Sequence, residues 1–289
     1  MRAVRLLAAG GPAQIVCEEI ARPEPADGAA LVRVHAAALT RDELEWHLDR
    51  LPAIPSYELS GVIEELGPGV DGLAVGAEVF AMTDFDRDGV AADYAAVSAH
   101  LLAPKPGALS HVEAAALPLP ALTAWQGLFV HGGLAAGQRV LIHGATGGVG
   151  QFATQLARER GAHVIGTTSE GARARALGAD EAIEASNFED GLEPVDLVFD
   201  TVGGERLTRS PAVLRPGGRV VSVAEEADET FYFVVEPDHE QLVEIGRLAD
   251  AGRLKVAIGE VFALEDARAA FERIAQPGKR GKVVLTPSS

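Results

Sequence analysis

The sequence predicts an α/β domain with a parallel sheet, joined to a domain of β-strands. Three observations indicate this. An apolar run, a glycine-rich turn, an amphipathic segment and a second apolar run follow one another over residues 138–166, which is the pattern of a βαβ unit. Short β-like runs separated by turn-forming residues fill residues 1–103, as in an antiparallel domain. From about His111 the apolar period changes to that of helices, which marks a domain boundary.

The first domain is expected to consist of short strands. Turn formers such as Gly10-Gly11-Pro12 and Asp27-Gly28 separate its apolar runs, and these residues favour the backbone angles that turns require. A short helix is expected at residues 42–48. The expected strands are residues 3–7, 15–20, 30–34, 61–66, 77–82, 94–97 and 101–103.

The second domain continues the βαβ pattern, and the end of the chain returns to the first domain. We place the first domain at residues 1–115 and 253–289 and the second at residues 116–252. Asp200 follows an apolar strand and is expected to cap the turn at Val202-Gly203. The further strands expected are residues 195–200, 218–223, 231–235 and 281–285, and the further helices are residues 112–117, 121–130, 239–251 and 267–274.

Composition narrows the class of protein. The 289 residues are 47% hydrophobic, enough for two modest domains with substantial cores. The net charge of −17 disfavours binding to nucleic acid or to an anionic membrane. No apolar stretch reaches the ~20 residues that a membrane span requires, and the N-terminus lacks a convincing signal peptide, so we expect a cytoplasmic protein. The single cysteine, Cys17, can form neither an intramolecular disulfide nor a thiolate zinc cluster.

The glycine-rich turn predicts a dinucleotide site. Glycines between a strand and a helix let backbone N–H groups approach a pyrophosphate, and the helix N-terminus favours its negative charge. The alternative is an ordinary strand–helix turn that happens to be rich in glycine. The expected phosphate loop is Gly144, Ala145, Thr146, Gly147, Gly148, Val149 and Gly150.

The end of the second strand favours NADP over NAD. An NAD-selective domain usually has Asp or Glu about 20 residues past the glycines, where it holds the ribose 2′-hydroxyl. Thr167-Thr168-Ser169 occupy this region instead. Thr168 and Ser169 offer hydroxyls to a 2′-phosphate, and Arg173 follows with a charge that suits the same group. Glu170, beside them, is the feature that opposes this assignment.

The order of motifs resembles the medium-chain dehydrogenase/reductase superfamily, and within it the zinc-free quinone oxidoreductase, or zeta-crystallin-like, branch. The resemblance implies a GroES-like β domain built from both ends of the chain and packed on a Rossmann domain with a doubly wound parallel sheet, the active site lying in the cleft between them. The motifs that carry it are Gly10-Gly11-Pro12, residues 61–70, Gly76 with Glu78-Val79-Phe80, residues 115–118, the glycine loop, residues 177–180, residues 200–204, residues 216–219 and residues 280–284.

The resemblance also bears on metal chemistry. Zinc alcohol dehydrogenases of this superfamily place their catalytic zinc ligands at positions that correspond here to Thr40, Tyr57 and Leu119. None of these is a good zinc ligand. Without a Lewis acid, oxidation of an alcohol is difficult. The resemblance therefore implies hydride transfer from NADPH to a quinone or an α,β-unsaturated ketone, with no metal.

The family pattern assigns further site residues. Thr40 stands where many members have an Asn that contacts substrate, so the resemblance does not decide whether Thr40 makes this contact. Tyr57 either donates a hydrogen bond to a substrate oxygen or packs under its loop, and we leave both readings open. Lys282 is expected to reach the cofactor phosphates. The residues expected to hold the nicotinamide end are Thr123, Val202, Val223, Phe231 and Phe233.

Two other functions remain open at this point. One is a protein that stores or senses NADPH without turnover, which the replaced Asn at Thr40 makes conceivable. The other is a zinc-dependent alcohol dehydrogenase. The resemblance further implies a homodimer, and the strand near Val220, expected at the sheet edge, is the joint that we predict.

Overall fold

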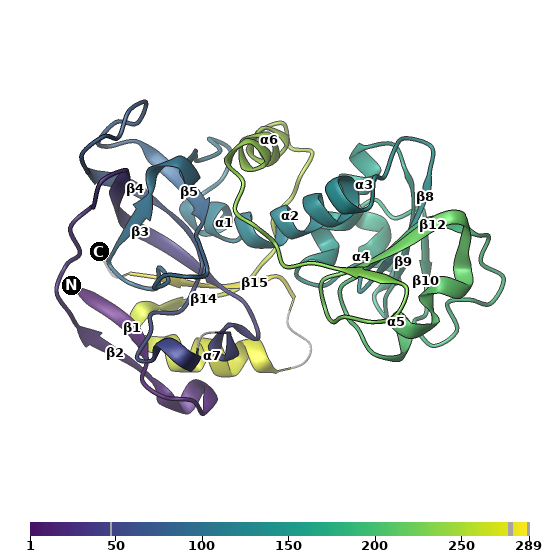
Figure 1. The fold of residues 1–289 in the computed structure, drawn as a ribbon, viewed down its shortest axis with the longest axis horizontal. Helices are drawn as coiled ribbons and strands as arrows, with labels where there is room; N and C mark the ends of the chain where they lie inside the picture. The colour runs from purple at the N-terminus through teal and green to yellow at the C-terminus, as the bar shows by residue number, and fades with distance from the viewer. Residues whose placement is uncertain (47, 277–279, 288–289) are drawn as a thin grey trace. The chain divides into compact units, whose positions relative to one another are not determined.

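The structure is a computed structural model that describes residues 1–46, 48–276 and 280–287. The chain forms two compact units (Figure 1). Unit 1 comprises Met1–Leu119 and Pro237–Ser289, so both ends of the chain contribute to it. Unit 2 is the continuous segment Pro120–Glu236. The helix α2 (Pro118–Trp125) begins at the end of the first segment of unit 1 and continues into unit 2.

Unit 1 is built on a seven-stranded sheet in the order β14-β15-β3-β4-β5-β7, with β6 paired to β3. The long strand β3 (Ala29–Leu39) pairs antiparallel with β4, β6 and β15. A separate hairpin joins β1 (Arg2–Leu6) to β2 (Ile15–Glu19). The other elements of the seven-stranded sheet are β4 (Glu58–Leu66), β5 (Glu78–Met82), β6 (Tyr94–Ser98), β7 (Ala103–Pro104), β14 (Ile258–Ala263) and β15 (Lys282–Thr286).

Three helices complete unit 1. The short helix α1 (His111–Ala115) begins with a capping box, in which Ser110 and Glu113 satisfy each other's backbone N–H groups; such reciprocal bonds are a strong helix start. The helix α7 (Ala267–Ala275) buries Phe271 and Ile274 in a core that it shares with β1 and β15. The third helix is α6 (His239–Asp250).

The place of α6 differs from the sequence-based domain limits of residues 116–252. The structure groups α6 with unit 1. A Cβ added at Gly246 would lie 3.4 Å from Cζ of Phe80 and 3.5 Å from Cγ of Pro106. The Asp250 carboxylate accepts a hydrogen bond from the N–H of Ala108 at 2.9 Å. The tight fit of the helix against Phe80 of β5 and the loop after β7 explains the difference, because helical periodicity does not reveal which sheet a helix will cover.

Unit 2 is a doubly wound parallel sheet of six strands in the order β10-β9-β8-β11-β12-β13. This matches the Rossmann order 3-2-1-4-5-6. The central strands are buried, and their middle residues are apolar (Val140–Ile142, Val164–Gly166 and Leu197–Phe199), as a sheet covered by helices requires. The strands are β8 (Arg139–His143), β9 (His163–Thr167), β10 (Glu181–Ile183), β11 (Val195–Asp200), β12 (Leu214–Ser222) and β13 (Thr230–Tyr232), and the helices after α2 are α3 (Gly150–Glu159), α4 (Gly171–Ala176) and α5 (Glu205–Arg209).

The expectation that the strand near Val220 forms the sheet edge is wrong. Strand β12, which contains Val220, pairs with β11 on one side and with β13 on the other. The outermost strand at this end is β13, because residues 230–232 return to the sheet and pair in parallel with residues 220–222.

Candidate active site

The glycine loop lies where the order of the parallel strands reverses. Strand β8 ends at His143, the loop follows, and α3 begins at Gly150. The neighbouring β11 ends at Asp200, and the two strands are paired from Leu197↔Val140 to Asp200↔His143. The loops that follow β8 and β11 therefore leave the sheet side by side. In doubly wound sheets this crevice is the place where nucleotides bind.

Two of the loop's glycines are required by close backbone packing. A Cβ at Gly150 would lie 2.0 Å from the carbonyl oxygen of Gly144, a distance that no side chain tolerates. Gly144 has φ = 72°, in the left-handed region that favours glycine. A Cβ there would meet Thr201 and Val202 from the loop after β11 at 2.9 and 2.8 Å. These two positions close the turn.

Gly147 and Gly148 have a different role, because both are exposed. A Cβ at Gly148 would have no atom within 4 Å, so folding does not require a glycine there. Among the described residues, none accepts a hydrogen bond from the N–H of Gly148 or Val149. Free N–H groups at the start of a ten-residue helix form an anion site. The loop therefore fits a dinucleotide pyrophosphate in a cradle that a side chain at Gly148 would fill.

The predicted 2′-phosphate residues lie close to this loop. Thr168 and Thr146 share a hydrogen bond of 2.9 Å between their hydroxyls. The Thr168 hydroxyl also accepts the N–H of Glu170 at 2.9 Å. Arg173 is half-buried and pairs with Glu170 at 3.2 Å, while Ser169 is exposed. Glu170, which argues against NADP, is thus ion-paired with Arg173, which argues for it.

The loop after β11 is held as predicted. Asp200 is fully buried. Its carboxylate accepts the N–H groups of Val202 and Gly203 at 3.2 and 3.0 Å. The Ser222 hydroxyl donates to the same carboxylate at 2.9 Å. The predicted cap of the turn is confirmed, and it leaves Val202 exposed beside Gly144.

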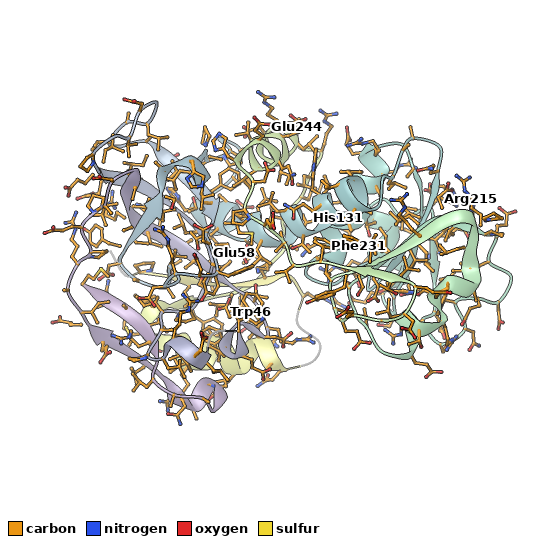
Figure 2. All side chains as sticks on the ribbon, in the orientation of Figure 1. Trp46, Glu58, His131, Arg215, Phe231 and Glu244 are labelled. Carbon is orange, nitrogen blue, oxygen red and sulfur yellow. The ribbon has the colours of Figure 1, made fainter. Side chains whose placement is uncertain are left out.

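The other residues expected at the nicotinamide end also lie in unit 2. Thr123 is buried in α2 and Val223 follows β12. Phe231 is 51% exposed, whereas Phe233 is buried. Both rings contact His131, with centroid distances of 4.8 and 4.4 Å, and Figure 2 labels His131 and Phe231. The contacts with His131 are enough to explain where the two phenylalanine rings lie, without a bound cofactor.

Unit 1 holds a buried polar cluster that the sequence did not predict. Glu58 is fully buried and ion-pairs with the Lys282 ammonium, which is 7% exposed. Lys282 also donates to the Thr40 hydroxyl at 3.3 Å. The N–H of Leu119 donates to the other Glu58 oxygen at 3.1 Å. Burial raises the pKa of Glu58, while the Lys282 ammonium and the Leu119 N–H oppose the rise.

Lys282 lies buried inside unit 1, where Glu58 binds its ammonium. Its contact with the cofactor phosphates stays a prediction. One feature of the sequence could have indicated this ion pair: Glu58 and Lys282 are oppositely charged, and each begins a strand, β4 and β15 respectively. Their 224-residue separation in sequence hides this pairing from any local pattern.

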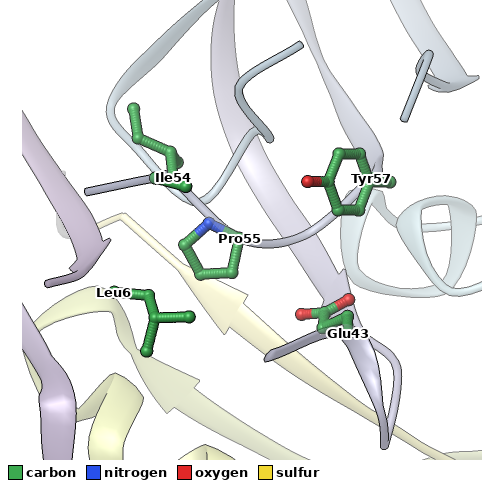
Figure 3. A pocket seen from close by; sticks show the side chains of 6 residues that line it. Leu6, Glu43, Ile54, Pro55 and Tyr57 are labelled. Atoms are coloured by element: carbon green, nitrogen blue, oxygen red, sulfur yellow. The ribbon is translucent and has the colours of Figure 1, made fainter. Parts of the chain in front are cut away.

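A second buried carboxyl, Glu43, lies near this pair. One of its oxygens accepts the N–H of Thr40 at 3.1 Å, and the other has no hydrogen-bond partner among the described residues. Burial raises the pKa of Glu43 to about 8, although Lys282 partly opposes this. The group is thus a neutral acid near neutral pH. Figure 3 shows it with Tyr57 in the lining of a pocket of about 10 Å³, room for about one water molecule.

Replacing Glu43 by glutamine is expected to flatten the pH dependence of stability. The folded carboxyl keeps its proton up to about pH 8, whereas the unfolded one loses it near the ordinary value of 4.5. Between these values the folded state binds the extra proton. The free energy of unfolding therefore falls as pH rises, by up to about 1.4 kcal/mol per pH unit. Urea unfolding of both proteins across this window measures the slope. Equal slopes would contradict the assignment.

Tyr57 is 2% exposed. Its ring lies 5.1 Å from that of Phe85 and 6.0 Å from that of Trp46, measured between centroids. Burial, together with the nearby Glu43, raises the pKa of its hydroxyl to about 12. This environment fits the packing role that we left open. A contact between the Tyr57 hydroxyl and a substrate stays a prediction.

Parts of the chain match two families of dehydrogenases. Residues 26–107 match the alcohol dehydrogenase GroES-like domain, and residues 177–285 match the zinc-binding dehydrogenase family. The chain is 34% identical over 291 residues to the 2-methylene-furan-3-one reductase of Solanum lycopersicum, an alignment that covers 93% of this chain and 74% of that protein. The chain belongs to the medium-chain dehydrogenase/reductase superfamily.

Two further relatives place the chain within this superfamily. A structure of the quinone oxidoreductase from Coxiella burnetii superimposes with a TM-score of 0.92 at 30% identity, covering 100% of this chain and 99% of the other. The spectinabilin polyketide synthase system protein NorB of Streptomyces orinoci is 38% identical over 299 residues. That alignment covers 93% of this chain but only 14% of the synthase protein. The superfamily resemblance, and the GroES-like and Rossmann-type folds that it implied, are confirmed.

The superfamily includes zinc enzymes, so the metal positions matter. In the part of the chain that the structure describes, no group of three or more His, Cys, Asp or Glu side chains is placed to hold a metal ion. At the three corresponding positions, Thr40 is bound by Lys282, Tyr57 is packed between aromatic rings, and Leu119 is tied to Glu58. Across the same described residues, no helix has both the length and the apolar character to cross a membrane.

Proposed function

We propose that the protein is an NADPH-dependent oxidoreductase that reduces a quinone or an α,β-unsaturated carbonyl compound without a metal ion. The observation that carries this proposal is the open phosphate cradle at Gly147-Gly148, beside the switch point of the parallel sheet. Relatives named as a quinone oxidoreductase and as a 2-methylene-furan-3-one reductase support the substrate class. The residue types at Thr40, Tyr57 and Leu119 support a reaction without zinc.

The residues proposed to hold the cofactor lie in unit 2. The N–H groups of Gly148 and Val149 would bind the pyrophosphate, and Thr168, Ser169 and Arg173 would bind the ribose 2′-phosphate. When bound, the nicotinamide supplies a hydride to the acceptor. Negative charge then develops on the acceptor's carbonyl oxygen, so a hydrogen-bond donor at that oxygen lowers the barrier. We assign this donor to the Thr40 hydroxyl, which is only half-buried, and a solvent proton completes the reduction.

The purified protein tests this proposal directly. It should oxidise NADPH in the presence of small quinones or enones, followed as loss of the absorbance of the reduced nicotinamide. Tight NADPH binding with no oxidation by any acceptor would instead indicate a sensor or storage protein. Stoichiometric zinc in elemental analysis would instead indicate a zinc-dependent dehydrogenase.

Arg173→Glu is expected to abolish or reverse a preference for NADPH over NADH. The substitution places a carboxylate next to Glu170 and repels a 2′-phosphate, whereas a 2′-hydroxyl can donate to it. We expect NADPH affinity to fall about tenfold or more, equal to about 1.4 kcal/mol. Titrations with NADPH and with NADH measure the change in affinity. The matched control is Arg175→Glu, because Arg175 lies two residues further along α4 and is exposed. An unchanged cofactor ratio would remove Arg173 from the site.

We also propose that the protein acts in the cytoplasm as a homodimer. The outer strand β13 has a free edge in the six-stranded sheet, and Phe231, Tyr232 and Val234 expose apolar side chains on and after it. An unpaired strand edge with apolar neighbours is prone to pair with another chain. Ultracentrifugation of the wild type and of Phe231→Lys would test this, since the substitution should shift the protein towards monomer.

A further inference from the structure

The buried ion pair of unit 1, Glu58 with Lys282, also contacts the hydroxyl of Thr40. Lys282 begins β15, Glu58 begins β4, and Thr40 follows the end of β3. An ammonium has three N–H donors and no acceptor. One of them is used by Glu58, and another by the oxygen of Thr40 at 3.3 Å. The hydroxyl therefore acts as the acceptor in this contact.

This contact determines what the Thr40 hydroxyl can do. A hydroxyl that accepts from an ammonium keeps its own proton for a second partner, and it becomes a stronger donor because the cation polarises it. The Thr40 side chain is half-buried, whereas Lys282 and Glu58 are buried. Of the two described side chains that contact the Lys282 ammonium, Thr40 is thus the one that is accessible to solvent.

We propose that Lys282 is a positioning residue that holds the Thr40 hydroxyl as a hydrogen-bond donor to the carbonyl oxygen of the acceptor. The inference rests on the proposed function and deepens it, since it names the residue that positions the Thr40 hydroxyl, the proposed donor to the developing oxyanion. Glu58 fixes the ammonium in place, and Leu119 fixes Glu58 through its N–H. The cluster would supply positive potential at the acceptor, a role that a metal ion fills in zinc enzymes.

A competing role is purely structural, in which the ion pair only ties β4 to β15. The two roles differ in their coupling to Thr40. If Lys282 acts through the threonine, removing either group should have the same effect on kcat, and removing both should add nothing. If the pair is only structural, the two losses should multiply.

The experiment compares Thr40→Val, the double variant Glu58→Gln/Lys282→Met, and the triple variant. The double variant removes both charges, so no unpaired charge remains buried. We expect each to lower kcat by about 10- to 100-fold, with no further loss in the triple variant and with unchanged NADPH affinity. Thr40→Ser, which keeps a hydroxyl, should retain activity. The control is Glu260→Gln/Arg273→Met, which removes an ion pair between β14 and α7 of the same unit and should leave kcat unchanged.

Three results would overturn the inference while leaving the proposed function intact. The first is an unchanged kcat in Thr40→Val, and the second is a multiplicative loss of kcat in the triple variant. The third is weaker NADPH binding in the double variant, which would indicate that Lys282 contacts the cofactor phosphates. Thr40→Val decides the matter by itself if the double variant does not fold. A wild-type protein that fails to oxidise NADPH in the presence of every quinone and enone tested would overturn the proposed function and this inference together.

Discussion

Lys282→Met is expected to lower the free energy of unfolding by about 3–5 kcal/mol. Glu58 is fully buried and Lys282 provides its counter-charge. Without the ammonium, Glu58 must either stay ionised in an apolar interior or take up a proton, and both alternatives cost free energy at neutral pH. Urea unfolding followed by circular dichroism at neutral pH measures the loss.

Two variants control this result. Glu58→Gln/Lys282→Met should recover most of the lost stability, because replacing a buried pair by uncharged groups is often neutral. Arg247→Met removes the exposed pair with Glu244, whose side chains are 74% and 44% exposed, and should change stability by less than about 1 kcal/mol. Equal effects of Lys282→Met and Arg247→Met would contradict the burial of the pair.

Gly148→Ala is expected to weaken NADPH binding about tenfold or more, equal to about 1.4 kcal/mol, while the protein remains folded. The added methyl group meets no protein atom within 4 Å, so it should not disturb the loop. It would occupy the cradle in which the N–H groups of Gly148 and Val149 approach the pyrophosphate. Fluorescence titration with NADPH, together with thermal unfolding of the protein alone, measures both quantities.

The matched control is Gly107→Ala. Gly107 is also exposed, and its added Cβ would have only one neighbouring atom, at 4.0 Å. This substitution should leave both NADPH affinity and stability unchanged. If Gly148→Ala behaves like Gly107→Ala, the loop does not bind the phosphates. Gly150→Ala differs from both, because its Cβ would overlap the Gly144 carbonyl and should destabilise the fold itself.

The sequence predicted the strand, the glycine turn and the helix of the proposed nucleotide site well, because this segment is local. Strand β8, the glycine loop and α3 are consecutive, and the carbonyl of Gly144 explains the glycine at position 150 of the same loop. Asp200 likewise caps a turn two and three residues away. Its prediction needed only the strand end and the glycine that follows.

The sequence predicted poorly wherever distant segments meet. The family pattern assigned Lys282 to the cofactor phosphates and gave no sign of its ion pair with Glu58, which lies 224 residues earlier in the chain. Val220 was placed at the edge although a strand was expected at residues 231–235, because an apolar run does not show which strand it pairs with. The helix α6 has a clear helical period, yet its packing against Phe80 and Pro106 is tertiary.

The sequence by itself determined the two kinds of domain, the glycine-rich turn between strand and helix, and the residue types at Thr40, Tyr57 and Leu119, since these depend on periodicity, glycine positions and residue identity along the chain. The tertiary structure decided which buried groups meet: it joined Lys282 to Glu58 and Thr40, and it buried Glu43, which raises the pKa of that carboxyl. The physical reason is that desolvation and ion pairing depend on distances in space, which no local pattern of residues specifies.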